Sequence, residues 1–177
     1  TSAGDVRLIV DGVNGVQANF PHPASRTRDI IETGAGAPRR IQYEFEYDDY
    51  GNEVEHRAFG VVDGDDRGVY GDERIERTEF AINEDLWFVR LPARREVLGL
   101  DGQVLARTEY YYDDETFSGA NFGQVTQGRE TLVRQWRDPD EPEAYVAARR
   151  MQYDDYGNAI TLLGPLAPLA VAVADIA

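Results

Sequence analysis

The chain has no cysteine, and this absence excludes several kinds of chemistry at once. Without thiols there is no disulfide framework, no zinc site with thiolate ligands and no cysteine nucleophile. Serine is scarce as well. The three serines are Ser2, Ser25 and Ser118, and none lies in the Gly-x-Ser-x-Gly sequence that presents a serine nucleophile above a sheet. The sequence therefore offers little for nucleophilic catalysis.

Histidine is nearly absent, since His22 and His56 are the only two side chains able to act as general bases near neutral pH. His22 stands between two prolines in a predicted loop, and His56 lies in a polar stretch of a predicted strand. We expect both at the surface. A carboxylate pair for glycoside hydrolysis is an alternative, but 33 acidic residues make some suitably spaced pair nearly inevitable. We therefore expect no enzymatic activity.

Lysine is absent too, so all 18 basic residues are arginines. The 33 acidic residues outnumber them, are spread along the whole chain and give a net charge of -15. Nucleic-acid binding needs clustered cationic charge, and a field of this sign repels both a polyanion and an anionic membrane surface. We therefore expect no nucleic-acid partner.

Apolar residues are concentrated in residues 162–177, which contain Pro165 and Pro168 and fall short of the ~20 residues that span a bilayer. We expect no membrane insertion, and a buried strand at residues 170–174. The chain begins at Thr1 without an apolar signal segment. This fits a processed secreted protein or an excised piece of a longer chain, and we favour the second.

A repeated hexapeptide, Tyr-Asp-Asp-Tyr-Gly-Asn, occurs at residues 47–52 and again at 153–158. Each copy follows a strand-like run; residues 40–47, for example, alternate between apolar and polar side chains. The first aspartate can accept hydrogen bonds from nearby amides, and glycine and asparagine tolerate the positive φ of a tight reversal. We therefore predict a hairpin turn at each copy. The motif residues are Tyr47, Asp48, Gly51, Asn52, Tyr153, Asp154, Gly157 and Asn158.

A degenerate third copy lies between these two. Residues 107–114 keep the order of arginine, aromatics and Tyr-Asp, with Tyr112 and Asp113 at the motif positions. Thr116 stands where the other copies have glycine, so we expect a looser turn. The motif tyrosines at 47, 112 and 153 follow no constant interval, which argues against a regular solenoid or propeller.

Strand patterns fill most of the chain, and no window shows sustained helical periodicity, although residues 84–88 could form a helical turn. We predict an all-β protein whose antiparallel, irregular hairpins form a curved open sheet. The length suffices for one domain. Residues 1–38 would form a segment of short strands and a loop, residues 39–164 the repeat-bearing sheet, and residues 165–177 an apolar tail that continues into a longer parent chain.

The order of arginine, alternating aromatics, Tyr-Asp, two residues and glycine resembles the YD repeat of the Rhs family. This family includes bacterial Rhs proteins, shell components of insecticidal toxin complexes, and the teneurins. The resemblance covers residues 39–163, and segments 60–64, 91–97 and 122–126 are similar to those between YD motifs.

The resemblance implies a structural segment of a β-shell that encloses or presents a toxin or effector polypeptide and has no chemistry of its own. The implied partners are the rest of a longer Rhs-like chain and its enclosed C-terminal effector, and the implied location is secreted or at the cell surface. Some family members cleave themselves at an Asp-Pro-x-Gly-Leu signature. Residues 138–141 read Asp-Pro-Asp-Glu, without that glycine and leucine, so this activity is not carried over.

One acidic loop is a candidate for calcium binding through carboxylate oxygens. It matches three positions of an EF-hand loop, but Arg67 and Arg74 stand at the fifth and twelfth positions and strands flank it. We favour a solvated loop and expect no metal or other cofactor. The candidate ligands are Asp63, Asp65, Asp66 and Asp72.

The alternative function is an extracellular carbohydrate-binding or adhesion module. Exposed aromatic rings stack on sugars, and Trp87 and Trp136 are the candidate glycan contacts. The repeat tyrosines could form a similar platform, but their alternation with charged residues favours packing on an inner face. Those tyrosines are Tyr43, Tyr47, Tyr110, Tyr112 and Tyr153.

Overall fold

The computed structural model describes residues 4–11, 17–30, 39–62, 71, 73–138, 140–141 and 144–165. In these ranges the chain forms eleven β-strands and no helix, so the all-β prediction is confirmed for the described residues. Residues 84–87, where a helical turn was an option, form a hairpin turn.

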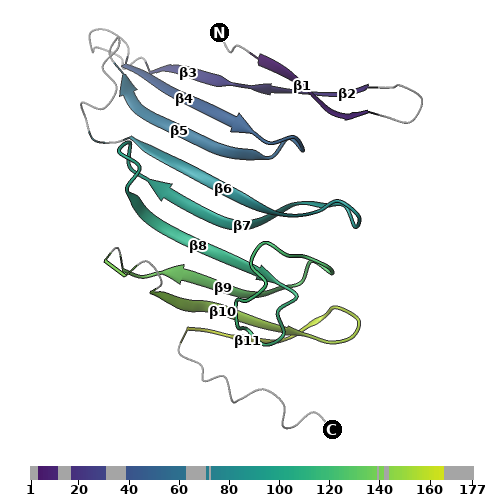
Figure 1. The fold of residues 1–177 in the computed structure, drawn as a ribbon. Coiled ribbons are helices and arrows are strands. Elements are labelled where there is room, and N and C mark those ends of the chain that lie inside the picture. The colour runs from purple at the N-terminus through teal and green to yellow at the C-terminus, as the bar shows by residue number, and fades with distance from the viewer. Residues whose placement is uncertain are drawn as a thin grey trace. The chain divides into compact units, whose positions relative to one another are not determined.

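Nine strands form one antiparallel sheet in the order β11-β10-β9-β8-β7-β6-β5-β4-β3 (Figure 1). Each strand pairs with its neighbours in the sequence, as short hairpin connections require. The order begins at β11 and ends at β3, so the sheet is open, as predicted. The strands are β3 (Ser25–Ile30), β4 (Arg39–Tyr47), β5 (Glu53–Val62), β6 (Arg74–Asn83), β7 (Phe88–Leu98), β8 (Val104–Tyr112), β9 (Glu130–Trp136), β10 (Tyr145–Tyr153) and β11 (Ala159–Leu163).

The other two strands, β1 (Gly4–Asp11) and β2 (Gln17–Pro23), form a separate antiparallel pair. The chain divides into two compact units. Unit 1 comprises Thr1–Thr78 and Glu96–Leu105, and unit 2 comprises Glu79–Arg95 and Ala106–Ala177.

In unit 1, a buried glutamate on β5 is held by arginines. Glu55 is 6% exposed and accepts hydrogen bonds from Arg57 and from Arg77 Nη2, the latter at 2.7 Å. Burial by itself would raise the pKa of Glu55, but the hydrogen bonds from Arg77 and Arg57 outweigh it and the pKa is lowered. The ion pair of Glu55 with Arg77 therefore links β5 to β6.

Unit 2 contains an apolar core built from strands and from the loop after β8. Ala81 and Ala93 are fully buried beside Tyr112 and Val125, with partly buried aromatic and aliphatic side chains packed around them. Tyr111 and Leu132 are also buried, and they are register partners on β8 and β9. Tyr111 and Tyr112 are consecutive and both are buried, and the register of β8 shifts between them.

Replacing Leu132 with alanine should destabilise the protein by about 2–5 kcal/mol, because Leu132 is 2% exposed and its removal leaves a cavity. Urea unfolding measures the change. The matched control is Leu162→Ala on β11, where the side chain is 67% exposed and the expected change is within ~0.5 kcal/mol. Equal effects in the two variants would contradict the assignment of Leu132 to the core.

Candidate functional site

The first hexapeptide closes the β4–β5 hairpin through the carboxylate of Asp48. Its Oδ1 accepts the backbone N–H groups of Tyr50 at 2.9 Å and Asn52 at 2.8 Å. Its Oδ2 accepts the side-chain amide of Asn52 at 2.8 Å. The Asp48 backbone donates to the carbonyl of Asn52 at 3.0 Å, and Gly51 adopts a φ of 78°. One carboxylate therefore organises the whole turn.

The second hexapeptide repeats this geometry in the β10–β11 hairpin. Asp154 Oδ1 accepts from the N–H groups of Tyr156 at 3.0 Å and Asn158 at 2.8 Å, and Oδ2 accepts from the Asn158 side chain at 2.8 Å. Gly157 has a φ of 86°. These hydrogen bonds lower the pKa of Asp154, and the bond from Asn158 contributes most. The repeated sequence thus forms the same turn twice.

A register shift precedes the motif tyrosine in all three copies. It falls between Glu46 and Tyr47, between Tyr111 and Tyr112, and between Gln152 and Tyr153. Such a shift re-aims the next side chain and increases local twist. In two copies the re-aimed hydroxyl donates to a carbonyl of a neighbouring strand, Tyr112 to Pro92 and Tyr153 to Glu130, both at 2.9 Å. The sequence pattern did not predict these irregularities.

The third copy is followed by a wide loop, where the other two copies form tight hairpin turns. The chain leaves the sheet after Asp113, which has a φ of 59°, and returns at Arg129. Asp113 donates its N–H to the Arg129 carbonyl at 2.8 Å, in the way that Asp48 donates to Asn52. The equivalent hydrogen bond therefore closes a tight turn in the first copy and the whole 114–128 loop in the third.

The Asp113 carboxylate accepts backbone N–H groups from the far end of this loop. Oδ2 accepts from Thr126 and Gln127, both at 2.8 Å, and from Gly128 at 3.2 Å, while Oδ1 accepts from Arg129 at 3.0 Å. Burial alone would raise the pKa of Asp113, but these bonds lower it. Asp113 therefore accepts backbone N–H groups as Asp48 and Asp154 do, but it closes a longer loop.

Asp114 holds the near end of the loop. Its carboxylate accepts from the N–H and hydroxyl of Thr116, at 3.1 and 2.7 Å, and from the N–H of Gly119 at 2.7 Å. Thr116 is therefore a hydrogen-bond donor here and does not replace the motif glycine in a hairpin turn. The connection is longer than those of the other two copies because the chain does not reverse within the motif.

Unit 2 also contains a buried polar network around Glu109 on β8. This carboxylate is 4% exposed and accepts hydrogen bonds from four side chains. They are Tyr111 Oη at 2.6 Å, Arg134 Nη2 at 3.0 Å, Tyr145 Oη at 3.0 Å and Arg94 Nη2 at 3.1 Å. Arg134 also lies over the rings of Tyr111 and Tyr145, at 4.6 and 4.9 Å from their centroids.

This network favours a charged glutamate and protonated tyrosines. Burial would raise the pKa of Glu109, but the hydrogen bonds from Tyr111, Arg134, Tyr145 and Arg94 outweigh it and lower the pKa. Burial and the hydrogen bond to Glu109 raise the pKa of Tyr111. The four donors come from β7, β8, β9 and β10, so the Glu109 carboxylate links four strands of unit 2.

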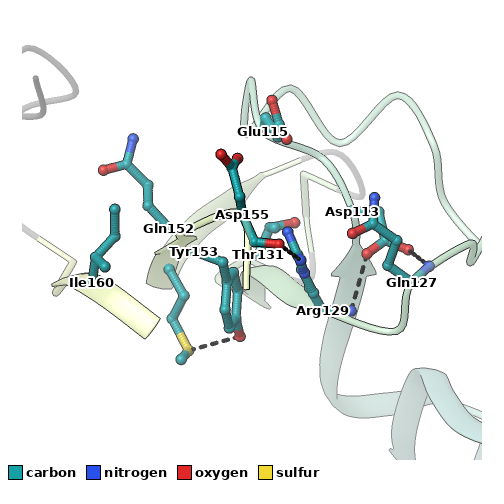
Figure 2. Close-up of a pocket in the computed structure, with 10 residues that line it drawn as sticks. Asp113, Glu115, Gln127, Arg129, Thr131, Gln152, Tyr153, Asp155 and Ile160 are labelled. Atoms are coloured by element: carbon teal, nitrogen blue, oxygen red, sulfur yellow. Dashed lines mark hydrogen bonds between the residues drawn. The ribbon is translucent and has the colours of Figure 1, made fainter. Parts of the chain in front are cut away.

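A pocket of about 380 Å³ lies between the 113–129 loop and the β10–β11 hairpin (Figure 2). The guanidinium group of Arg129 lies in the pocket. Its Cζ is 6.0 Å from the centroid of the Tyr153 ring, and its Nη2 donates to the Asp155 carbonyl at 3.4 Å. Burial raises the pKa of Tyr153. The pocket is lined by Asp113, Glu115, Gln127, Arg129, Thr131, Met151, Gln152, Tyr153, Asp155 and Ile160.

The chemistry available in this pocket is hydrogen bonding and charge. Asp113 has its carboxylate oxygens occupied by backbone amides, whereas Glu115 and Asp155 are exposed. Neither a histidine nor a serine is among the described residues that line the pocket. Within the described ranges, no group of three or more His, Cys, Asp or Glu side chains is arranged to hold a metal ion.

The two candidate glycan-binding tryptophans are not brought together. Trp87 is at the tip of the β6–β7 hairpin, 62% exposed, with a φ of 57°. Asn83, at the same tip, donates to the Val125 carbonyl at 2.7 Å, which places the tip beside the 113–129 loop. Trp136 ends β9 at the opposite end of the strands, where Arg107 lies 5.8 Å from its ring. A shared aromatic platform is therefore absent.

Other predicted features fall in different places. The His56 side chain is 28% exposed; its ring stacks on Phe45 with centroids 4.9 Å apart, and its Nε2 is buried. The ring of His22 lies 4.2 Å from Tyr47. The candidate calcium ligands and the predicted strand at 170–174 are outside the described residues. The calcium candidates are Asp63, Asp65, Asp66 and Asp72.

No protein-family model and no curated protein matches this chain. A search of the described residues for a helix long and apolar enough to cross a membrane finds none.

Replacing Asp48 with alanine should lower the free energy of unfolding by about 1–2 kcal/mol, because three hydrogen bonds of the turn lose their acceptor. Urea unfolding measures this. Asp49→Ala, one residue further and exposed, is the control and should change stability by less than ~0.5 kcal/mol. If Asp48→Ala kept full stability, the turn role of this aspartate would be wrong.

Stability should fall in acid, in part through Glu109. Since the folded-state pKa of Glu109 is lowered, its contribution is complete above the unfolded value of about 4.3 and is lost as the pH falls below it. Glu109→Gln should cost roughly 2–3 kcal/mol at pH 7, less than for a fully buried pair because Arg94 and Arg134 are partly exposed.

The same variant should lose less stability than the parent protein between pH 5 and pH 3, since one titrating group is gone. Urea unfolding across this range tests the difference in slope. Glu115→Gln, at an exposed position of the 113–129 loop, should leave the slope nearly unchanged. A Glu109→Gln slope as steep as that of the parent would show that Glu109 does not carry this part of the acid sensitivity.

Proposed function

We propose that this chain is a structural segment of an Rhs-type, YD-repeat β-shell that encloses or presents a toxin or effector polypeptide and performs no chemistry of its own. The observation that supports this most is the use of the motif aspartates. Asp48, Asp113 and Asp154 each accept several hydrogen bonds that close a hairpin or a loop. The repeated feature therefore shapes a sheet, and the oxygens of these three carboxylates accept the hydrogen bonds of the turns.

The sheet itself supports the same function. The connections between its strands range from a tight turn at Asp48 to the 113–129 loop. Each of them joins two strands that are neighbours in the sheet. In our proposal these are YD-type hairpins in a curved wall, and further strands of a longer parent chain pair with β3 and β11. An unpaired edge strand is otherwise a site of unwanted association. The parent protein would be secreted or displayed at the cell surface.

The second candidate is an extracellular carbohydrate-binding or adhesion module. One observation favours it: Trp87 and Leu86, at the tip of the β6–β7 hairpin, are 62% and 54% exposed. An exposed indole at a hairpin tip is a suitable surface for stacking on a sugar ring. Trp136 would not take part in the same contact, because it lies at the other end of the strands.

The shell proposal predicts protection of an enclosed polypeptide in the full-length parent protein. Under limited proteolysis the C-terminal effector should stay intact, and the double variant Asp48→Ala/Asp154→Ala should allow its cleavage because two hairpin closures are weakened. The matched control is Asp49→Ala/Asp155→Ala, which changes the neighbouring aspartate in each turn. Mass spectrometry of the fragments gives the readout.

Two results would contradict the shell. One is a short stand-alone reading frame, with no further YD repeats and no C-terminal effector to enclose. The other is glycan-array binding by the purified chain that is lost in Trp87→Ala and kept in Trp136→Ala, which would establish the adhesion module. Turnover of a glycoside that depends on a single carboxylate would instead indicate a hydrolase.

A further inference from the structure

A second pocket, of about 540 Å³, lies on one face of unit 1. This volume is within the range of ~300–1,000 Å³ that is usual for small-molecule sites. Three adjacent strands contribute to it, and they are labelled β3, β4 and β5 in Figure 1. The lining residues are Arg26, Thr27, Arg28, Tyr43, Phe45 and His56.

The strand register places cationic and aromatic side chains on the same face. Arg26 is the partner of Tyr43, and Phe45 is the partner of His56. Antiparallel partners share a face, and residues two apart along a strand share it too, so Arg28 lies on this face about 7 Å from Arg26. The face therefore runs from two guanidinium groups on β3, over aromatic rings on β4, to an imidazole on β5.

The charge of this pocket is opposite to that of the chain. The chain carries a net charge of -15, yet none of the described residues that line the pocket is acidic. The nearby acids Asp29 and Glu44 belong to the other face of the sheet by register, and there Asp29 binds Arg40 at 2.8 Å. Arg26 and Arg28 are exposed and form no ion pair with another side chain in the described ranges.

His56 adds an unsatisfied polar atom. Its ring is stacked on Phe45 and lies 5.5 Å from the ring of Tyr43, and its Nδ1 is 3.9 Å from a Glu53 oxygen. Its Nε2 is buried and has no hydrogen-bond partner. Buried polar atoms are nearly always paired, so an unpaired one at a pocket wall calls for a partner.

We propose that this pocket binds a small organic anion in which a carboxylate or a phosphate is attached to a flat ring. Arg26 and Arg28 bind the anionic oxygens, because guanidinium groups match both anions through paired N–H donors. The rings of Tyr43 and Phe45 pack against the flat part of the ligand. The Nε2 of His56 is buried, so the ligand becomes its partner only when the imidazole turns toward the pocket. This site is independent of the shell function proposed above.

The test is binding of simple probes to the purified chain by isothermal titration calorimetry. Phenylacetate and phenyl phosphate combine a ring with an anion, benzyl alcohol has only the ring, and inorganic phosphate has only the anion. We expect the two combined probes to bind more tightly than either single-feature probe. The preferred member of the pair then identifies the anion as carboxylate or phosphate, and both results support the site.

The double variant Arg26→Gln/Arg28→Gln should weaken binding of the better probe by roughly 10-fold, since charge-assisted hydrogen bonds are lost. Arg90→Gln, at an exposed strand position of unit 2, is the matched control and should leave the affinity unchanged. Urea unfolding of each variant checks that the fold is kept. An imidazole NMR shift of His56 on addition of the probe gives a readout that does not depend on the arginine variants.

Three results would overturn the proposal. They are the absence of saturable binding at about 10 mM probe, equal affinity for benzyl alcohol or inorganic phosphate and the combined probes, and equal loss of affinity in the Arg90 control. A combined probe that binds without shifting the His56 imidazole would place the ligand elsewhere on the chain.

Discussion

The interaction on which this structure depends most is the acceptance of several backbone N–H groups by one aspartate carboxylate at the end of a strand. A chain reversal leaves amides without strand partners, and each needs an acceptor. Asp48 and Asp154 supply it within four residues, and Asp113 supplies it across the 113–129 loop. The same residue type at the same motif position thus lets loops of very different length leave and re-enter one sheet without unpaired amides.

A related arrangement binds the strands within each unit. Glu55 in unit 1 and Glu109 in unit 2 are buried carboxylates, and each accepts hydrogen bonds from two arginines. The planar guanidinium reaches across a strand and donates in a fixed geometry, while an ammonium group carries a compact charge on a flexible stem. The use of arginine in place of lysine therefore has a structural consequence here, whatever its origin in the genome.

The strands and the two tight turns could be predicted from sequence because their causes are local. Alternation in residues 40–47 and the Asp, Gly and Asn of each hexapeptide act within a few residues. The third copy could not be predicted this way, because Asp113 has its partners at Thr126 to Arg129, and nothing in residues 112–116 indicates that distance. The missing glycine suggested a loose turn, whereas the carboxylate, and not the glycine, decides how the copy closes.

The candidate sites were harder to predict for a similar reason. Glu109 lies in an alternating strand, where a polar position suggests exposure, and its burial follows from arginines and tyrosines on neighbouring strands. Likewise, His56 and Arg26 are 30 positions apart in unrelated sequence contexts, and only the pairing of β3, β4 and β5 places them around one pocket. Turns can be predicted from residues that are close in sequence. Predicting a site also requires knowing which residues of neighbouring strands are paired.

The hydrogen bonds that give these acids a structural role also keep them charged. The oxygens of Asp113 and Glu109 accept N–H and O–H donors, and the pKa of each carboxyl is lowered, so both stay ionised near neutral pH. Binding in the described part of the chain is to be sought where hydrogen-bonding capacity is unused, as at the guanidinium groups of Arg26 and Arg28 and the Nε2 of His56.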